Sequence, residues 1–181
     1  MAKKEQNIIL GVTASIAIYK ACEIIRRLRA CGLLVHVVMT KEAQELIKPV
    51  VFRSLSGNKV YLGQMFEEQD SWDINHIALA RKADLILIAP ATANIIAKLA
   101  AGICDDLLSC TVCAAESKVL IAPAMNENMY NNKITQSNIA KLKSCGYKFI
   151  APGKGLLACG MVGTGCLAEV SDIVKEVRKI L

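Results

Sequence analysis

The segment Pro123–Tyr130 combines amide and thioether side chains directly after an apolar run that is typical of a buried strand. In α/β proteins the carboxyl ends of such strands line the ligand site. The amide of Asn126 can donate to a substrate carboxylate, and Met125 and Met129 offer adaptable walls to a flat ring. The alternative is that Asn126 only caps a helix that begins near Glu127.

A second polar cluster follows the first apolar run of the chain. Gly11 permits a tight turn there, and Thr13 and Ser15 place hydroxyl groups beside the free backbone amides of an expected helix start, where anions bind. The three-glycine dinucleotide pattern is absent, which favours a single phosphate and therefore a mononucleotide over NAD. An ordinary hydroxyl cap of the helix is the alternative.

Two further polar segments follow predicted strands in the same way. Thr40 comes directly after the second apolar run, and Ala89–Asn94 follows the third with proline, threonine and asparagine. Each segment alone could be ordinary turn chemistry, because these residue types favour turns and helix caps. Their repetition at successive strand ends instead predicts one crevice that is lined by hydroxyl and amide groups.

Two residues could move protons. His76 lies outside the strand patterns, ahead of a helix expected near Ile77, and can titrate near neutral pH, whereas His36 alternates within a strand and is predicted to be structural. Cys159 lies in the glycine-dense loop 155–165, which could carry a proton donor to a closed site. Cysteine is a plausible acid, because an unperturbed thiol has a pKa of about 8.5. A surface histidine and an incidental loop thiol are the alternatives.

The composition favours one compact domain over residues 1–181. The hydrophobic content is 54%, and no apolar run is long enough for a transmembrane helix or a signal peptide core. We therefore expect a cytoplasmic protein with reduced cysteines and no membrane partner. Cys110 and Cys113 lack the further ligands of a zinc site, so no metal is expected. The net charge of +6 is spread along the chain and favours anionic ligands, without a pattern for nucleic acid.

Apolar runs and helical periodicity alternate along the chain. A first strand is expected over 7–11 and a helix over 16–30. Further strands are expected over 33–39, 83–89, 118–122 and 147–150. Because these runs are apolar, they predict a doubly wound parallel sheet in a Rossmann-like, flavodoxin-like three-layer α/β fold. The segment 48–77, which contains Trp72, is less regular and could be a substrate flap or an oligomer contact.

Taken together, these segments resemble the homo-oligomeric flavin-containing cysteine decarboxylases over essentially the whole chain. The likeness is strongest to the members that act on 4′-phosphopantothenoylcysteine in coenzyme A biosynthesis. It rests on six segments in this order: Gly11–Lys20, His76, Ala89–Ile95, Gly102–Leu108, Pro123–Met129 and Ala158–Gly160. Two positions depart from the family pattern: Tyr130 stands where tryptophan is frequent, and Cys166 stands where arginine commonly follows the glycine loop.

The resemblance implies a role for each matching position. Asn126 would bind the substrate carboxylate with Met129 and Ala158 beside it, while His76 and Cys159 would be catalytic. The implied contacts of bound FMN are Gly11, Thr13, Ala14, Ser15, Thr40, Phe52, Thr92, Ala93, Asn94, Ile95 and Met125. The assembly would be a trimer or a dodecamer with the flavin site between subunits. The chain would be the decarboxylase alone, without the ligase domain that bacterial members often carry.

The implied chemistry explains why a flavin is needed. Loss of carbon dioxide from a cysteinyl carboxylate leaves a carbanion that cannot delocalise, so a cofactor must first create an electron sink. Oxidation by FMN would give a thioaldehyde and then an enethiolate, which is reduced again and takes a proton from Cys159 to give 4′-phosphopantetheine. The alternatives are a peptidyl-cysteine decarboxylase, which would not need Cys159, a flavin prenyltransferase, and a non-catalytic regulatory protein of the same fold.

Overall fold

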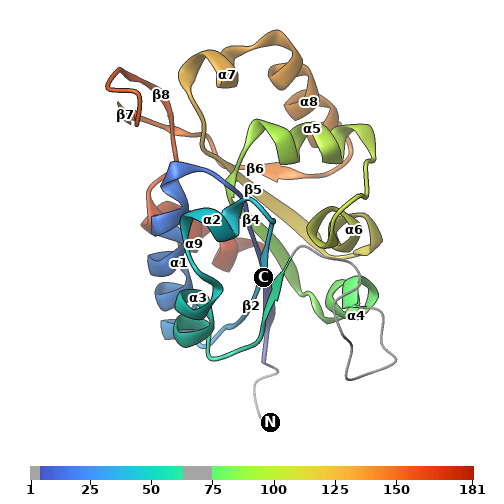
Figure 1. The fold of residues 1–181 in the computed structure, drawn as a ribbon. Coiled ribbons are helices and arrows are strands. Elements are labelled where there is room, and N and C mark those ends of the chain that lie inside the picture. Colours follow the sequence, from blue (N-terminus) through green and yellow to red (C-terminus); the bar gives the residue numbers. More distant parts are fainter. Residues whose placement is uncertain (1–4, 63–74) are drawn as a thin grey trace.

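A six-stranded parallel sheet forms the centre of the molecule (Figure 1), in a computed structural model that describes residues 5–62 and 75–181. The strand order is β3-β2-β1-β4-β5-β6, and every neighbouring pair is parallel. The strands are β1 (Asn7–Val12), β2 (Leu34–Met39), β3 (Val60–Leu62), β4 (Leu85–Ala91), β5 (Lys118–Pro123) and β6 (Lys148–Phe149). This is the Rossmann order, in which the chain reverses direction across the sheet between β1 and β4. The predicted doubly wound sheet is confirmed.

Helices cover both faces of the sheet and complete the three layers. One face packs against the 3₁₀ helix η1 (Ile16–Ile18), α1 (Tyr19–Ala30), α2 (Ala43–Leu46), α3 (Pro49–Ser56) and α9 (Val170–Ile180). The other face packs against α4 (Asn75–Lys82), α5 (Ala93–Ala101), α6 (Leu107–Ala114) and α8 (Lys133–Ser144). The short α7 (Glu127–Asn131) precedes α8 near the carboxyl end of β5.

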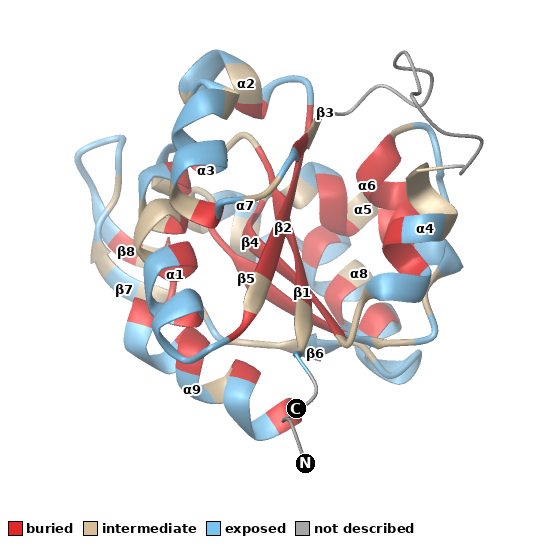
Figure 2. Ribbon diagram, turned by 90° about the horizontal axis from the view of Figure 1, so that it is seen from below, coloured by how far each residue is buried: buried red, intermediate tan, exposed pale blue. Residues whose placement is uncertain are grey.

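Burial on both faces explains why the strands are apolar throughout (Figure 2). In β1 the side chains of Ile8 and Leu10 enter the cluster beneath α1, whereas Ile9 enters the cluster on the opposite face. All three are fully buried. Burying a side chain of this size contributes about 1.5 to 3 kcal/mol, so the central strands hold the sheet firmly in place.

The two segments that were expected to be irregular contain regular structure. Within 48–77, the structure has α3 and the edge strand β3, and α4 begins at Asn75, so that His76 lies inside this helix and not ahead of it. Trp72 lies outside the described residues. The glycine-dense loop contains an antiparallel hairpin of β7 (Gly153–Leu156) and β8 (Val162–Cys166), which extends from the sheet beside α7 (Figure 1).

The described helices also bear on the membrane prediction. None of the helices in residues 5–62 and 75–181 combines the length and apolar character that are needed to cross a bilayer.

Candidate active site

A cavity of ≈ 460 Å³ opens at the carboxyl edge of the sheet, within the usual size range of small-molecule sites. Its wall is built from the loop between β1 and α1, the start of α5, the turn after β5 and the β7–β8 hairpin. The predicted site residues that line it are Ala14, Ser15, Thr92, Met125, Asn126, Met129, Ala158 and Cys159. Four separate stretches of sequence therefore meet at one site, next to the reversal point of the sheet.

Asn126 and Cys159 come into direct contact in this cavity. Asn126 Oδ1 accepts from the Asn128 backbone N–H over 2.8 Å, which caps α7 as expected. This bond fixes the orientation of the amide, so that Nδ2 donates to Cys159 Sγ over 3.5 Å. The capping role and the predicted binding role are compatible, because the oxygen serves the helix while the NH₂ group faces the cavity.

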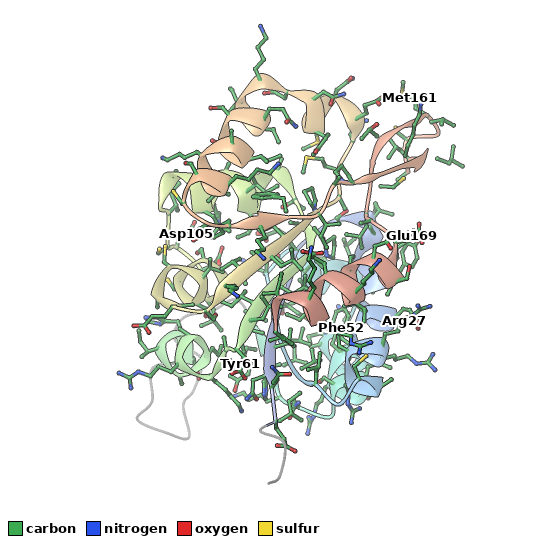
Figure 3. All side chains as sticks on the ribbon, turned by 180° about the vertical axis from the view of Figure 1, so that it is seen from behind. Arg27, Phe52, Tyr61, Asp105, Met161 and Glu169 are labelled. Atoms are coloured by element: carbon green, nitrogen blue, oxygen red, sulfur yellow. The ribbon has the colours of Figure 1, made fainter. Side chains whose placement is uncertain are left out.

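The hairpin that carries Cys159 is attached to the same turn by its base. The Met125 backbone N–H donates to the Gly165 carbonyl over 3.0 Å. Gly165 has φ 151°, and a Cβ there would collide with the Met125 carbonyl oxygen, so that only glycine fits. The hairpin tip, labelled by Met161 in Figure 3, is exposed to solvent. The Cys159 thiol therefore lies on a hairpin whose base is held by a backbone contact and whose tip is exposed to solvent.

Thr13 joins the ends of β1 and β4 beneath the cavity. Its hydroxyl donates to the Pro90 carbonyl over 2.7 Å and accepts from the Thr92 backbone N–H over 3.1 Å. The side chain is only 2% exposed and is not part of the cavity wall. The hydroxyl that was predicted to bind a phosphate thus fixes the floor of the crevice.

Two of the remaining predicted hydroxyls, those of Ser15 and Thr92, act as helix caps. Ser15 Oγ accepts from the Ala17 backbone N–H over 3.4 Å at the start of η1, and Thr92 Oγ1 accepts from the Ile95 N–H over 3.4 Å. Both residues also line the cavity. Thr40 is buried, accepts from the Ala43 N–H over 3.4 Å and is not part of the cavity wall. Capping does not prevent Ser15 and Thr92 from contacting a ligand.

The structure corrects the prediction of a tight turn at Gly11. It lies inside β1 and not in a turn, paired with Val38 of β2 and Ile88 of β4. A Cβ at this position would lie 2.6 Å from Leu108 Cδ1 of α6. The glycine is therefore explained by close packing between the sheet and α6, and it needs no special backbone conformation.

Eight predicted residues are not part of the wall of this cavity. The members of this group are Gly11, Thr13, Thr40, Phe52, His76, Ala93, Asn94 and Ile95. Phe52 is fully buried in the core between α3 and the sheet (Figure 3), and Ile95 is buried in the opposite cluster. His76 is half-buried in the first turn of α4. A single subunit thus brings Asn126 and Cys159 together, but not His76.

The sequence patterns gave no role to Lys20, which also lines the cavity. Among the described residues of the wall, it alone carries a charge. Its Nζ lies 3.7 Å from Glu169 Oε1, whose side chain is 76% exposed, so that this ion pair is weak and open to exchange. The signal in the sequence was a lysine one helical turn beyond the hydroxyls of the first loop.

His36 is structural, as predicted. It is buried in β2, and its Nε2 lies 3.2 Å from Asn7 Oδ1. Burial lowers the pKa of His36, and the positive charge of Lys82 lowers it further. This histidine therefore stays neutral at physiological pH and takes no part in the cavity.

The segment Gly102–Leu108 holds α5 to α6. Asp106 Oδ1 accepts from the Ser109 N–H over 2.8 Å and caps α6, and Lys98 Nζ contacts Asp105 over 2.7 Å and Asp106 over 2.9 Å. Burial alone would raise the pKa of Asp106, but its hydrogen bonds with Ser109 and Lys98 outweigh burial and lower it. This network supports Leu108, whose side chain packs on Gly11.

The cysteine pair of α6 shows no feature of a metal centre. A side-chain hydrogen bond with Cys104 and burial raise the pKa of Cys113 to about 11, and burial raises the pKa of Cys110 as well. Both thiols therefore remain protonated at neutral pH. Within 5–62 and 75–181, no three histidine, cysteine or acidic side chains are arranged to hold a metal ion.

Comparisons with known proteins identify relatives of the whole chain. The chain is 46% identical over 97% of its length to a probable phosphopantothenoylcysteine decarboxylase of Streptococcus mutans, 99% of which is covered. It is 47% identical over 96% of its length to the coenzyme A biosynthesis bifunctional protein CoaBC of Bacillus subtilis, but spans only 43% of that protein.

Solved structures share the fold. A mutant PPC decarboxylase complexed with pantothenoylaminoethenethiol matches with a TM-score of 0.85 and 30% identity, over 97% of this chain and 98% of the other. The FMN-dependent cysteine decarboxylase SpaF matches with a TM-score of 0.84 and 31% identity, over 97% of each chain. The family model described as Flavoprotein matches residues 1–181. The chain therefore belongs to the flavoprotein family.

Proposed function

We propose that this chain is an FMN-dependent decarboxylase that converts 4′-phosphopantothenoylcysteine to 4′-phosphopantetheine in coenzyme A biosynthesis. The observation that carries the proposal is the 3.5 Å contact between Asn126 Nδ2 and Cys159 Sγ, because it places a carboxylate ligand beside a proton donor in one cavity. The 46% identity to the probable phosphopantothenoylcysteine decarboxylase supports the choice of substrate. The proposal assigns this reaction to one domain over residues 1–181.

The cavity fits a flavin mononucleotide by the chemistry of its wall. Ala14, Ser15 and Thr92 present small and hydroxyl-bearing residues at helix starts, where a phosphate is stabilised, and Met125 supplies an apolar surface for a ring. FMN supplies the electron sink that decarboxylation of a cysteinyl group requires. The remaining predicted contacts, among them Phe52 and Thr40, would act from beneath the wall or from a neighbouring subunit.

Asn126 would orient the substrate. Its Nδ2 hydrogens point into the cavity because Oδ1 is held by the Asn128 N–H. An amide donor aimed at a carboxylate fixes the position of the group that leaves, without adding a negative charge that would repel it. Met129 and Ala158 line the wall beside it and would contact the cysteinyl part of the substrate.

Cys159 would donate the proton that completes the product. A thiol can act as a general acid and donate its proton to an enethiolate carbon. In the structure the thiol receives a hydrogen bond from Asn126. The proton donor and the carboxylate ligand thus act within one hydrogen bond of each other.

Lys20 would attract the anionic substrate. It is the charged residue among the described cavity-lining side chains, and the proposed substrate carries both a phosphate and a carboxylate. The weak ion pair with the exposed Glu169 can open when a stronger anion arrives. Lys20→Gln is expected to raise KM more than it lowers kcat.

His76 would enter the site from another subunit of a homo-oligomer, either a trimer or a dodecamer, in the cytoplasm. The cavity of the same subunit is lined by elements other than α4, and α4 lies at a distance from the hairpin in the fold (Figure 1). Complementation tests this arrangement. Mixed oligomers of His76→Asn and Cys159→Ser chains should regain part of the activity that each variant lacks alone, and failure to regain any would place both residues in one subunit's site.

Purified protein, loaded with FMN and mixed anaerobically with 4′-phosphopantothenoylcysteine, tests the function. The expected product has lost carbon dioxide alone. A product that has also lost two hydrogens would indicate chemistry of the peptidyl-cysteine decarboxylase type. Binding of FMN without turnover would indicate a regulatory protein instead.

A further inference from the structure

Glu127, the residue after Asn126, holds the hairpin that carries Cys159. Its Oε1 accepts from the Thr164 backbone N–H of β8 over 2.8 Å, across 37 positions of sequence. The carboxylate is half-buried at the start of α7. A hydrogen bond to a charged acceptor is stronger than one between neutral groups, so this contact can fix a strand edge.

The backbone of β8 is shaped to receive this carboxylate. A Cβ on Gly163 would lie 2.5 Å from Glu127 Oε2 and 2.7 Å from its Cδ. One carboxylate oxygen therefore accepts a hydrogen bond from the Thr164 N–H, while the other lies beside Gly163, which has no side chain. The contact is specific to a carboxylate-sized group at this position.

Few other contacts hold the hairpin in place. Leu156, Met161 and Val162 are 71%, 60% and 68% exposed. In the described residues, β7 and β8 pair with each other and form a sheet of their own, and two-stranded hairpins are marginally stable without support. The base is held by the Met125–Gly165 bond, and Glu127 adds a second attachment closer to the tip.

The geometry points to Glu127 as a positioning residue for the proton donor. By fixing β8 to the turn that contains Asn126, it keeps Cys159 next to the site where the substrate carboxylate is bound. This inference rests on the proposed function of Cys159. It follows that loss of Glu127 affects the protonation step much more than the preceding oxidation and loss of carbon dioxide.

Hydrogen exchange tests the attachment without any substrate. In the FMN-loaded protein, the Thr164 amide of Glu127→Ala should exchange about tenfold faster than in the wild type, because its acceptor is gone. Glu127→Gln keeps an acceptor oxygen and should remain within about threefold of the wild type. Equal exchange in the wild type and Glu127→Ala would overturn the attachment, whatever the enzyme catalyses.

Single-turnover kinetics test the consequence. Glu127→Ala should bleach the flavin within about twofold of the wild-type rate, recover its colour at least about tenfold more slowly and release enethiol that lacks two hydrogens. Glu127→Gln should restore most of the recovery, and Glu176→Ala on α9 is the matched control without effect. Equal slowing of both phases, or none, would overturn the inference. A wild type that turns over no substrate would instead refute the proposed function, while the exchange result on Thr164 would still stand.

Discussion

The edge of the parallel sheet and the β7–β8 hairpin form opposite walls of one cavity but are built in contrasting ways. The ends of β1 and β4 are buried, tied by Thr13 and backed by fully buried strands. The hairpin is antiparallel, glycine-rich and exposed at its tip, over residues 158–162. Under the proposed function, the groups that would hold the cofactor lie on the most stable part of the fold, while the proposed proton donor lies on a part that can open to admit substrate.

Local stability explains this division. Buried strands open only with global unfolding, whereas an exposed two-stranded element can open at little cost in free energy. Under the proposed function, substrate enters beneath Cys159, and a rigid lid would slow its entry and the release of product. The following predictions test whether the two walls are independent.

Asn126→Asp should have the largest effect, because it changes the turn after β5 at the proposed point of substrate binding. A carboxylate in place of the amide repels the substrate carboxylate and removes the donor, so activity should fall by on the order of 10³-fold or more. Flavin bleaching with substrate should be lost as well. Anaerobic absorbance spectroscopy measures this. Bleaching at the wild-type rate would exclude Asn126 as the carboxylate ligand.

Gly165→Ala should affect the hairpin and leave the sheet intact. The added Cβ collides with the Met125 carbonyl oxygen, and φ 151° is unfavourable for alanine. Displacement of the thiol should lower product formation by about 10- to 100-fold with little change in Tm. Gly32→Ala, at φ 78° with open space around it, is the matched control. A large fall in Tm with Gly165→Ala would show that the hairpin and the core unfold together.

Gly11→Ala should affect the sheet and leave the hairpin intact. A Cβ 2.6 Å from Leu108 Cδ1 overpacks the interface with α6, so the free energy of unfolding should fall by about 1 to 3 kcal/mol in urea titrations. A second substitution, Leu108→Val, should restore part of the loss. Full stability together with lost FMN binding would instead assign Gly11 a direct cofactor contact.

The pH dependence of stability should show the smallest effect, through His36. Because burial lowers its pKa, the folded protein resists a proton that the unfolded chain accepts, so stability falls as the pH drops below about 6.5. In His36→Gln, the loss of unfolding free energy between pH 7 and pH 5 should be smaller by roughly 1 kcal/mol or less. An identical pH profile in the two proteins would remove His36 as a contributor.

The sheet could be predicted from sequence because its strands are buried on both faces. Runs such as Leu85–Ala89 are apolar throughout, and this pattern needs no knowledge of neighbours. The β7–β8 hairpin was not predicted, because Gly153–Leu156 has no apolar alternation and pairs only through backbone groups and docking contacts. The edge strand β3 has only three residues, too few for a periodic signal.

Some of the residues that line the cavity could also be predicted from the sequence. The polar residues after β1, β4 and β5 share one edge by topology, so their convergence follows from the fold class. The engagement of Thr13 within the protein, the contact of Gly11 with Leu108 and the position of Lys20 in the cavity wall depend on tertiary packing. The proposed approach of His76 to the site of another subunit depends further on assembly, which one chain does not determine.

Anaerobic rapid mixing of the FMN-loaded wild type and Cys159→Ser with 4′-phosphopantothenoylcysteine tests the division between the two walls most directly. The account predicts equal bleaching of the flavin in both proteins, followed by full recovery and 4′-phosphopantetheine in the wild type only. In Cys159→Ser, recovery should slow by about 10²-fold or more and the product should lack two hydrogens. Recovery at the wild-type rate in Cys159→Ser, or no bleaching in the wild type, would contradict it.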